Sequence, residues 1–154
     1  MTAGSIELLE LEQLVDDGEE VIYRQITIHM RDGNKIRTDA FGPSTADKFM
    51  PSYARSSVTS AQDARDWHTR NAKSASTAVY GVSVGEAIAS GRHVVDDSEV
   101  PLAAGEVRSP GHCFVDFRGL TKNEVRVLRT KLYFHAVARD EIATSETLED
   151  GQLH

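Results

Sequence analysis

The alternation of apolar and polar residues along the chain predicts short strands and amphipathic helices, and it is clearest over 111–139. We expect a strand over 112–117, a short loop and then a helix of about 18 residues. Thr121 and Glu124 have the Thr-x-x-Glu spacing of a capping box at the helix start. Apolar residues then recur at helical intervals of three and four: Val125, Leu128, Leu132 and Ala136. This strand and helix are therefore predicted to form a central part of the core.

A leucine-rich, acidic stretch over 5–16 also has the spacing of an amphipathic helix. Ser5 is suited to cap its start, and Asp17-Gly18 to end it. We expect this N-terminal acidic helix to dock on the domain. A role as a helix for a partner remains the alternative.

The segment 20–29 is rich in β-branched residues and reads as a strand. Alternation places Ile22, Arg24 and Ile26 on one face, so Arg24 falls in the middle of an apolar surface. A buried guanidinium is costly unless a carboxylate or an anionic ligand meets it. Either the Arg24 side chain reaches out to solvent, or it is paired or binds a ligand.

The rest of the pattern predicts a hairpin, two further helices and more strands. These are a turn at Asp32-Gly33 with a returning strand over 35–41, a helix over 60–71, a strand over 75–84, a short helix over 85–91 and a minor strand at 94–95. In the 60–71 helix, Trp67 is expected to anchor the core, with Arg65 turned away. Residues 44–60 and 96–110 are predicted loops, and a loop as long as 44–60 is more often functional or mobile than merely connective.

These elements predict an α+β fold, with a mostly antiparallel sheet of four to five strands and about three helices packed on it. Residues 1–139 are expected to form a single globular domain. The acidic segment 140–154 is expected to be a disordered tail.

The charges are unevenly distributed. The net charge is −7, yet all 17 Lys and Arg lie between Arg24 and Arg139, with acidic segments on either side. The last predicted helix carries a basic stripe of Lys122, Arg126 and Arg129. A basic centre between acidic ends suits a phosphate-bearing partner, or the acidic ends fold back over the basic surface. The acidic pI and the absence of interleaved aromatics do not favour dedicated nucleic-acid binding. Val127 and Phe134 on the same helix favour a protein partner or a second copy of the chain.

Several classes of chemistry find no support in the sequence. No His or Cys spacing typical of a metal site occurs, so no metal is expected, and no glycine-rich phosphate loop precedes a helix. Cys113 is the only cysteine and is expected to be buried and inert. The chain lacks a long apolar run and a secretory signal, so we expect a cytoplasmic protein without a membrane span.

A few polar residues are candidates for a site. Glu86 follows a predicted strand, although it also suits the first turn of the following helix. His112 and Asp116 share a strand face, but four residues of strand separate them by roughly 13 Å, too far for a direct pair. The catalytic candidates are Arg24, Glu86 and His112. The candidates for binding a ligand or partner are Arg55, Ser57, His68, Lys122, Arg126 and Arg129.

Two resemblances add to this interpretation. The segments Tyr23-Arg24-Gln25, Phe41-Gly42-Pro43, Tyr80 to Glu86 and Gly111-His112 resemble a group of short uncharacterised bacterial proteins, which implies no activity. The order of Arg24, the Ser56–Ser60 stretch and Glu86 is similar to the Arg–Ser–Glu order of ADP-ribosyltransferase-like enzymes and toxins. That resemblance implies NAD as cofactor, Arg24 as phosphate anchor and Glu86 as the residue that stabilises the ribose oxocarbenium. The Ser/Thr stretch departs from the family because it precedes a helix, and Glu86 lacks the family's paired Glu or Gln.

The sequence therefore favours a small cytoplasmic protein of bacterial type that works by binding a partner, without a cofactor. The alternative is a nucleotide- or NAD-using transferase that relies on Arg24 and Glu86. Whether the chain is an enzyme stays open. A pocket in which Arg24 and Glu86 converge would favour the transferase.

Overall fold

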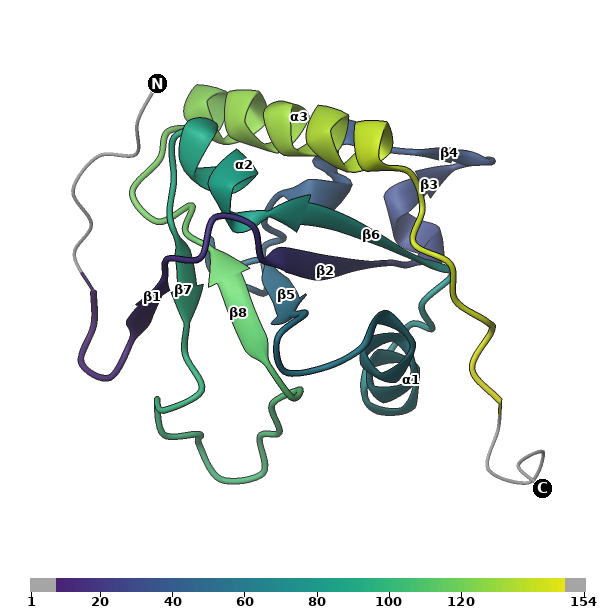
Figure 1. Cartoon of the computed structure of the whole chain (residues 1–154), viewed down its shortest axis with the longest axis horizontal. Coiled ribbons are helices and arrows are strands. Elements are labelled where there is room, and N and C mark those ends of the chain that lie inside the picture. The colour runs from purple at the N-terminus through teal and green to yellow at the C-terminus, as the bar shows by residue number, and fades with distance from the viewer. Residues whose placement is uncertain (1–7, 149–154) are drawn as a thin grey trace.

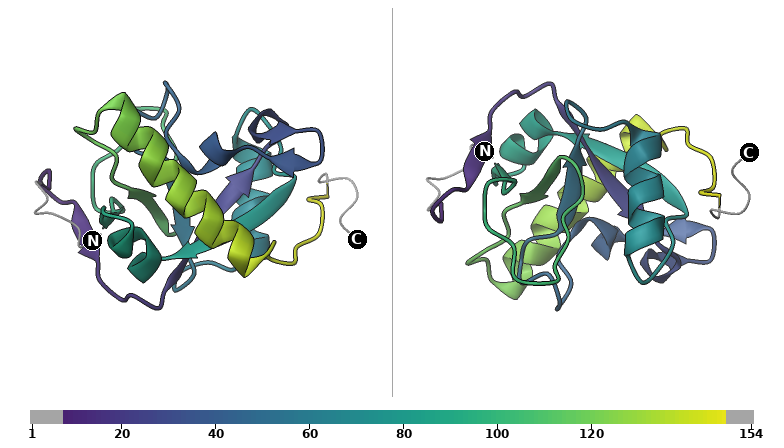
Figure 2. Two further views of the ribbon diagram at one scale, coloured as in Figure 1. Left: turned by 90° about the horizontal axis from the view of Figure 1, so that it is seen from above. Right: turned by 90° about the horizontal axis from the view of Figure 1, so that it is seen from below.

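A computed structural model describes residues 8–148, which form a six-stranded antiparallel sheet, a two-stranded hairpin and three α-helices (Figure 1). The strand order of the main sheet is β1-β7-β8-β5-β2-β6. Helix α3 (Lys122–Arg139) crosses one face of the sheet, and α1 (Ala61–Asn71) lies on the opposite side (Figure 2). The α+β prediction is confirmed, with more strands in the main sheet than expected.

The strands are short, and most pair with neighbours that are distant in sequence. The main sheet contains β1 (Gln13–Val15), β2 (Val21–Ile26), β5 (Ser52–Arg55), β6 (Ala78–Ser83), β7 (Val94–Asp96) and β8 (His112–Val115). The hairpin consists of β3 (Arg31–Asp32) and β4 (Lys35–Ile36) and turns at Gly33, whose φ of 65° is in the left-handed region that glycine favours. Instead of a strand over 35–41, β4 ends at Ile36 and the 3-10 helix η2 (Thr38–Phe41) follows.

All three α-helices begin at a serine or threonine that caps a backbone N–H three residues on. Thr121 and Glu124 form the predicted capping box of α3. Ser83 and Glu86 form a second box at the start of α2 (Val84–Ala89). The predicted apolar stripe of α3 is the set of residues that this helix buries: Val125, Leu128, Leu132 and Ala136. They pack with Phe41 and Ile22 in the core between α3 and the sheet.

The predicted N-terminal helix is wrong where the structure describes it. Residues 8–16 contain no helix, and Gln13–Val15 instead form β1, an edge strand in which Val15 pairs with Val94 of β7. Leu11 has a φ of 71°, which is incompatible with a continuous α-helix. Long-range pairing with β7 has overridden the local leucine spacing. Residues 5–7 of the predicted helix lie outside the described residues.

The predicted loop 44–60 contains an interior strand of the sheet, β5. β5 lies between β2 and β8 in the sheet, and its Tyr53 and Ala54 are buried. Only four residues long and preceded by Pro51, this strand is too short to display alternation in the sequence. Its place follows from its two partners instead.

The acidic C-terminal segment is attached to the domain as far as it is described. The Ile142 N–H donates to the Val79 carbonyl at 2.9 Å, along the outer edge of β6. Arg65 Nη1 donates to Thr144 Oγ1 at 2.8 Å, and Arg65 is buried under this segment rather than turned away. Within the predicted tail, residues 140–148 thus make hydrogen bonds to the domain, and the rest of the predicted tail lies outside the described residues.

Two searches of the described residues concern membrane spans and metal ligands. No helix within 8–148 has the length and apolar character needed to cross a membrane. Over the same residues, no three His, Cys, Asp or Glu side chains gather as metal ligands would.

Candidate functional site

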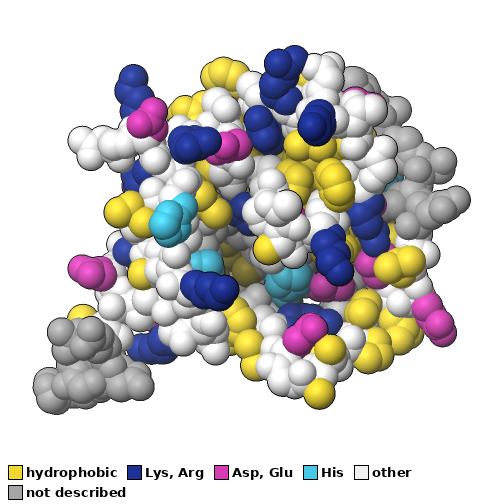
Figure 3. Space-filling model, turned by 180° about the vertical axis from the view of Figure 1, so that it is seen from behind, with side chains coloured by type: hydrophobic (Ala, Val, Ile, Leu, Met, Phe, Trp, Pro, Cys, Tyr) yellow, Lys and Arg dark blue, Asp and Glu magenta, His cyan; other side chains and the backbone are white. Residues whose placement is uncertain are grey.

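A cavity of about 510 Å³ opens beside α1. Its walls come from β2, β5, β8, α1 and the loop that follows β7. Figure 3 shows this face hollowed, with histidine and basic side chains around the hollow. The lining includes two residues named as candidates on β2 and β8, Arg24 and His112, and a third on α1, His68. The fold thus brings together three candidates that lie far apart in the sequence.

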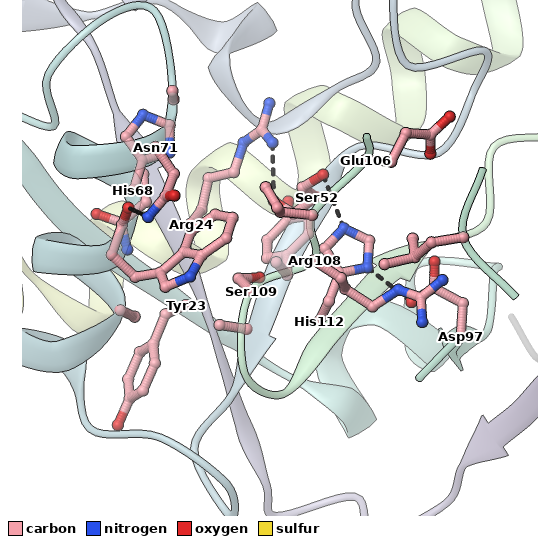
Figure 4. A pocket seen from close by; sticks show the side chains of 18 of the residues that line it. Tyr23, Arg24, Ser52, His68, Asn71, Asp97, Glu106, Arg108, Ser109 and His112 are labelled. Atoms are coloured by element: carbon pink, nitrogen blue, oxygen red, sulfur yellow. Dashed lines mark hydrogen bonds and ion pairs between the residues drawn. The ribbon is translucent and has the colours of Figure 1, made fainter. Parts of the chain in front are cut away.

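His112 lies between a carboxylate and a hydroxyl in this cavity (Figure 4). Its Nδ1 is 2.6 Å from Asp97 Oδ1, and its Nε2 is 3.0 Å from Ser52 Oγ. Ser52 and His112 are the first residues of the neighbouring strands β5 and β8, and Ala54 is the residue opposite His112. Ser52 is therefore a diagonal neighbour of His112 on the same sheet face. The sequence singled out His112 but neither Ser52 nor Asp97.

Arg24 is buried at the cavity wall with 7% of its surface exposed, so of the two alternatives its side chain does not reach out to solvent. No carboxylate within the described residues pairs with it. Its guanidinium instead donates to three backbone carbonyls, those of Ala40, Ser52 and Gly42, at 2.8, 2.9 and 3.3 Å. It also lies 5.4 Å from the ring centre of Tyr53, a cation–π distance. Arg24 therefore ties η2 and β5 to β2 and leaves its positive charge beside the cavity.

Helix α1 supplies the aromatic wall of the cavity. Trp67 is half-buried and lines the cavity, so it anchors the core less than predicted. His68 Nε2 lies 3.0 Å from the Ser74 carbonyl and donates to it. Burial lowers the pKa of His68, the nearby charge of Arg24 lowers it further, and the Ser74 hydrogen bond offsets this only in part. His68 is therefore neutral at pH 7, as a packing residue would be.

The opposite wall is a loop held by Arg108. Its guanidinium donates to the carbonyls of Ser98 and Val100 at 3.0 and 2.7 Å. Asp97, Glu106 and Arg108 from this loop line the cavity. The hydrogen bonds of Arg108 close the loop on itself and fix the backbone next to Asp97.

Glu86 does not line this cavity, so the structure does not bring it together with Arg24. It belongs to the capping box of α2 and forms an ion pair with Arg139 at 2.8 Å, with His135 Nδ1 at 3.5 Å. Burial raises the pKa of Glu86, but the bonds from Arg139 and the Ser83 N–H outweigh burial and lower it. Its bonds with Ser83 are those expected of an acidic residue in the first turn of a helix.

Arg55 and Ser57 are engaged inside the domain. Arg55 forms ion pairs with Glu20 and Asp96, both at 2.8 Å. The hydroxyl of Ser57 donates to the same Glu20 carboxylate at 2.6 Å. These two residues, named as binding candidates, join β5 to β7 and to the start of β2.

A second cavity, of about 620 Å³, lies between the start of α3 and the turn after η2. We call it the basic groove, because its lining contains four cationic side chains, from Lys48, Lys122, Arg126 and Arg129, and no acidic residue. The apolar part of the lining is Pro43, Phe49, Leu120 and Val125. The three residues of the predicted stripe converge here, and Lys48 joins them from the predicted loop 44–60.

Two features of the basic groove involve conformation and burial. Lys48 and Phe49 have φ angles of 52° and 71°, an arrangement that is costly for non-glycine residues. The Nε of Arg129 is buried and has no acceptor within the described residues. Nearby, Asp47 accepts from the N–H and hydroxyl of Ser44. The groove is thus a shaped surface whose positive charge is not neutralised by its own lining.

Cys113 is buried, as expected, and burial raises its pKa, which keeps the thiol protonated and unreactive. Comparison with known proteins finds no matching family model, no matching curated protein and no matching solved structure. The function therefore has to be argued from this chain's own residues.

Proposed function

We propose that the protein is a binding module that recognises an acidic segment of a partner protein in the basic groove. The observation that carries the proposal is the convergence of Lys48, Lys122, Arg126 and Arg129 on one groove whose lining contains no acid. Like charges that lie close together repel one another and destabilise the free protein. An anionic partner relieves this repulsion when it binds, which contributes to its affinity.

The overall charge of the protein makes the basic groove a selective place for an acidic partner to bind. The net charge of the protein is −7, so an acidic partner is attracted only where positive side chains are concentrated, as they are in the groove. Arg126 and Arg129 add the planar fork that pairs with a carboxylate through two parallel hydrogen bonds. Electrostatic attraction of this kind speeds association and fixes the orientation of the bound segment.

The apolar part of the groove favours a protein segment over a nucleic acid. Phe49, Leu120 and Val125 offer surface that apolar side chains of a partner can cover. Elsewhere on α3, Val127 and Phe134 are 44% and 63% exposed. An acidic segment with interspersed apolar residues satisfies both kinds of surface.

Fluorescence anisotropy with a labelled short peptide of Glu and Leu residues tests this function. Arg126→Glu is expected to weaken binding by about tenfold or more, because it removes one ion pair and adds a repulsion. Lys131→Glu is the matched control, since Lys131 is on the same helix but does not line the groove. Equal weakening by both substitutions would show that net charge alone is responsible. Tighter binding of a single-stranded oligonucleotide than of the peptide would replace the protein partner with a nucleic acid.

A further inference from the structure

We infer that Ser52, His112 and Asp97 form a catalytic relay that transfers an acyl group from an ester to water in the cavity beside α1. This activity does not depend on the basic groove, because the two cavities share no lining residue.

The hydrogen-bond order fixes the proton on the His112 ring. The Asp97 carboxylate only accepts hydrogen bonds, so the His112 nitrogen 2.6 Å from it, Nδ1, carries the proton. In the neutral ring, Nε2 is then the unprotonated nitrogen, 3.0 Å from Ser52 Oγ, and accepts the Ser52 O–H. A hydroxyl, a base and a carboxylate that orients the base are the arrangement that activates a serine nucleophile.

The exposure of Ser52, His112 and Asp97 suits a catalytic role. Ser52 is exposed, whereas the side chains of His112 and Asp97 are each only 19% exposed. The nucleophile is thus open to a ligand, and the base and its orienting acid are shielded. Ser52 and His112 lie on interior strands of the sheet, and the loop that bears Asp97 is closed by Arg108. A relay on rigid elements holds its geometry when a substrate enters.

The reaction balances without any reactant beyond the ester and water. Ser52 Oγ bonds to the ester carbonyl carbon while its proton passes to His112 Nε2. The bond from that carbon to the alcohol oxygen then breaks, and His112 returns the proton to the departing oxygen. Water attacks the acyl group on Ser52 and gives a proton to His112, which passes it to Ser52 Oγ as the carboxylic acid leaves. The Asp97 carboxylate stabilises the His112 imidazolium that forms in each half.

The cavity also indicates the class of substrate. Arg24 lines the same cavity and is buried, and its Nη1 donates to the Ser52 backbone carbonyl at 2.9 Å, so its positive charge lies next to the backbone of the nucleophile. A positive charge on the cavity wall favours the negative charge that develops on the ester carbonyl oxygen during attack. Trp67 and Tyr23 line the cavity on the α1 side, and Leu102 and Val107 on the loop side. An ester with an aromatic or apolar portion fits these walls.

Hydrolysis of p-nitrophenyl butyrate and labelling by a fluorophosphonate test the inference on the full chain. We expect time-dependent labelling that mass spectrometry assigns to Ser52. Ser52→Ala should abolish the label and lower the rate at least about a hundredfold, and His112→Gln should do the same. Asp97→Asn preserves the shape of the side chain but is expected to lower the rate strongly, because it removes the charge that holds the His112 tautomer.

Ser109→Ala is the matched control, since Ser109 lines the same cavity but its side chain is outside the relay. It should retain both the label and the rate, and thermal unfolding of each variant should show that the fold is intact. Lys131→Glu, which lies outside both cavities, should also leave the rate unchanged. Wild-type protein that is neither labelled nor faster than buffer would overturn the inference. A label that persists in Ser52→Ala would do so as well.

Discussion

Arg118 and Glu12 form a two-pronged ion pair across 106 positions of sequence, with both nitrogen–oxygen distances at 3.0 Å. Arg118 also bonds to Asp116 Oδ1 at 2.8 Å and lies 5.1 Å from the ring centre of Phe114. The Glu12 carboxylate is only 4% exposed. The pair therefore secures the segment before β1 to the chain after β8, which explains why a leucine-rich stretch leaves the helical conformation at this edge.

Arg118→Ala is expected to lower the free energy of unfolding by about 2–3 kcal/mol, because it leaves the buried Glu12 carboxylate without its cation and leaves Asp116 with Arg92 alone, 3.8 Å away. Partial exposure of Arg118 keeps the loss below that of a fully buried pair. Urea denaturation measures the change. Arg37→Ala is the control, since Arg37 pairs with Asp39 at the surface, where solvent screens the charges, and its loss should leave the stability nearly unchanged. Equal effects of both substitutions would contradict the structural role of the Glu12 pair.

The Glu20 carboxylate should make stability depend on pH in the acid range. Burial raises the pKa of Glu20, but the bonds from Arg55 and Ser57 outweigh burial and hold it below its ordinary value of 4.5. The folded state thus binds this proton less readily than the unfolded state. Its contribution is full above about pH 4.5 and is lost as the pH falls through the lower, folded pKa.

Glu20→Gln tests that dependence by removing the titrating group. The variant should be less stable than wild type at pH 7 and should lose less stability between pH 5 and the acid limit of folding. Chemical denaturation at a series of pH values checks both. Asp96, whose pKa is also lowered, keeps a residual slope in the variant. An unchanged slope would show that Glu20 is not held ionised by Arg55.

Gly111 requires glycine for two reasons. Its φ is 71°, and a Cβ there would lie 3.0 Å from Val58 Cβ and 3.2 Å from the Arg55 nitrogen. We expect Gly111→Ala to cost about 2–4 kcal/mol from backbone strain and crowding together. Gly33→Ala isolates the strain, since Gly33 has a φ of 65° and open space around it, and should cost about 1 kcal/mol. Thermal or urea unfolding of both variants gives the difference, and a difference near zero would contradict the crowding.

The two sides of α3 should respond differently to truncation. Leu132→Ala is expected to cost about 3 kcal/mol, since Leu132 is fully buried between α3 and the sheet. Phe134→Ala, on the exposed side, should cost less than about 1 kcal/mol, mostly from its edge contact with Tyr133. Equilibrium unfolding measures both. A large loss from Phe134→Ala alone would mean that this side is covered.

The elements that the sequence predicts well are those whose signals are local. Thr121, Glu124 and Ser60 occupy fixed offsets from the helices they cap, and the stripe of α3 repeats with the helical period. These features depend on neighbours within one or two turns. The local sequence therefore contains enough information to place both long helices and the faces they bury.

What the sequence missed depends on partners far along the chain. β5 is defined by β2 and β8 on its two sides, and β1 by β7 and by the Arg118 pair. The relay has the same origin: His112 is 60 residues from Ser52 and 15 from Asp97, and no motif spacing joins them. His112 was a candidate because it is a polar residue on a core strand. Its neighbours Ser52 and Asp97 can be identified only once the order of the strands is known.

The bridge between Ile142 and Val79 also affects whether copies of the protein associate with one another. β6 ends the main sheet, and an uncovered strand edge offers free N–H and carbonyl groups to any passing strand. Ile142 occupies that edge, and its side chain reaches toward Gly81, the one β6 residue without a side chain to shield the backbone. The segment after α3 thus acts as a guard against edge-to-edge polymerisation, and a chain cut after Arg139 would be prone to assemble through β6.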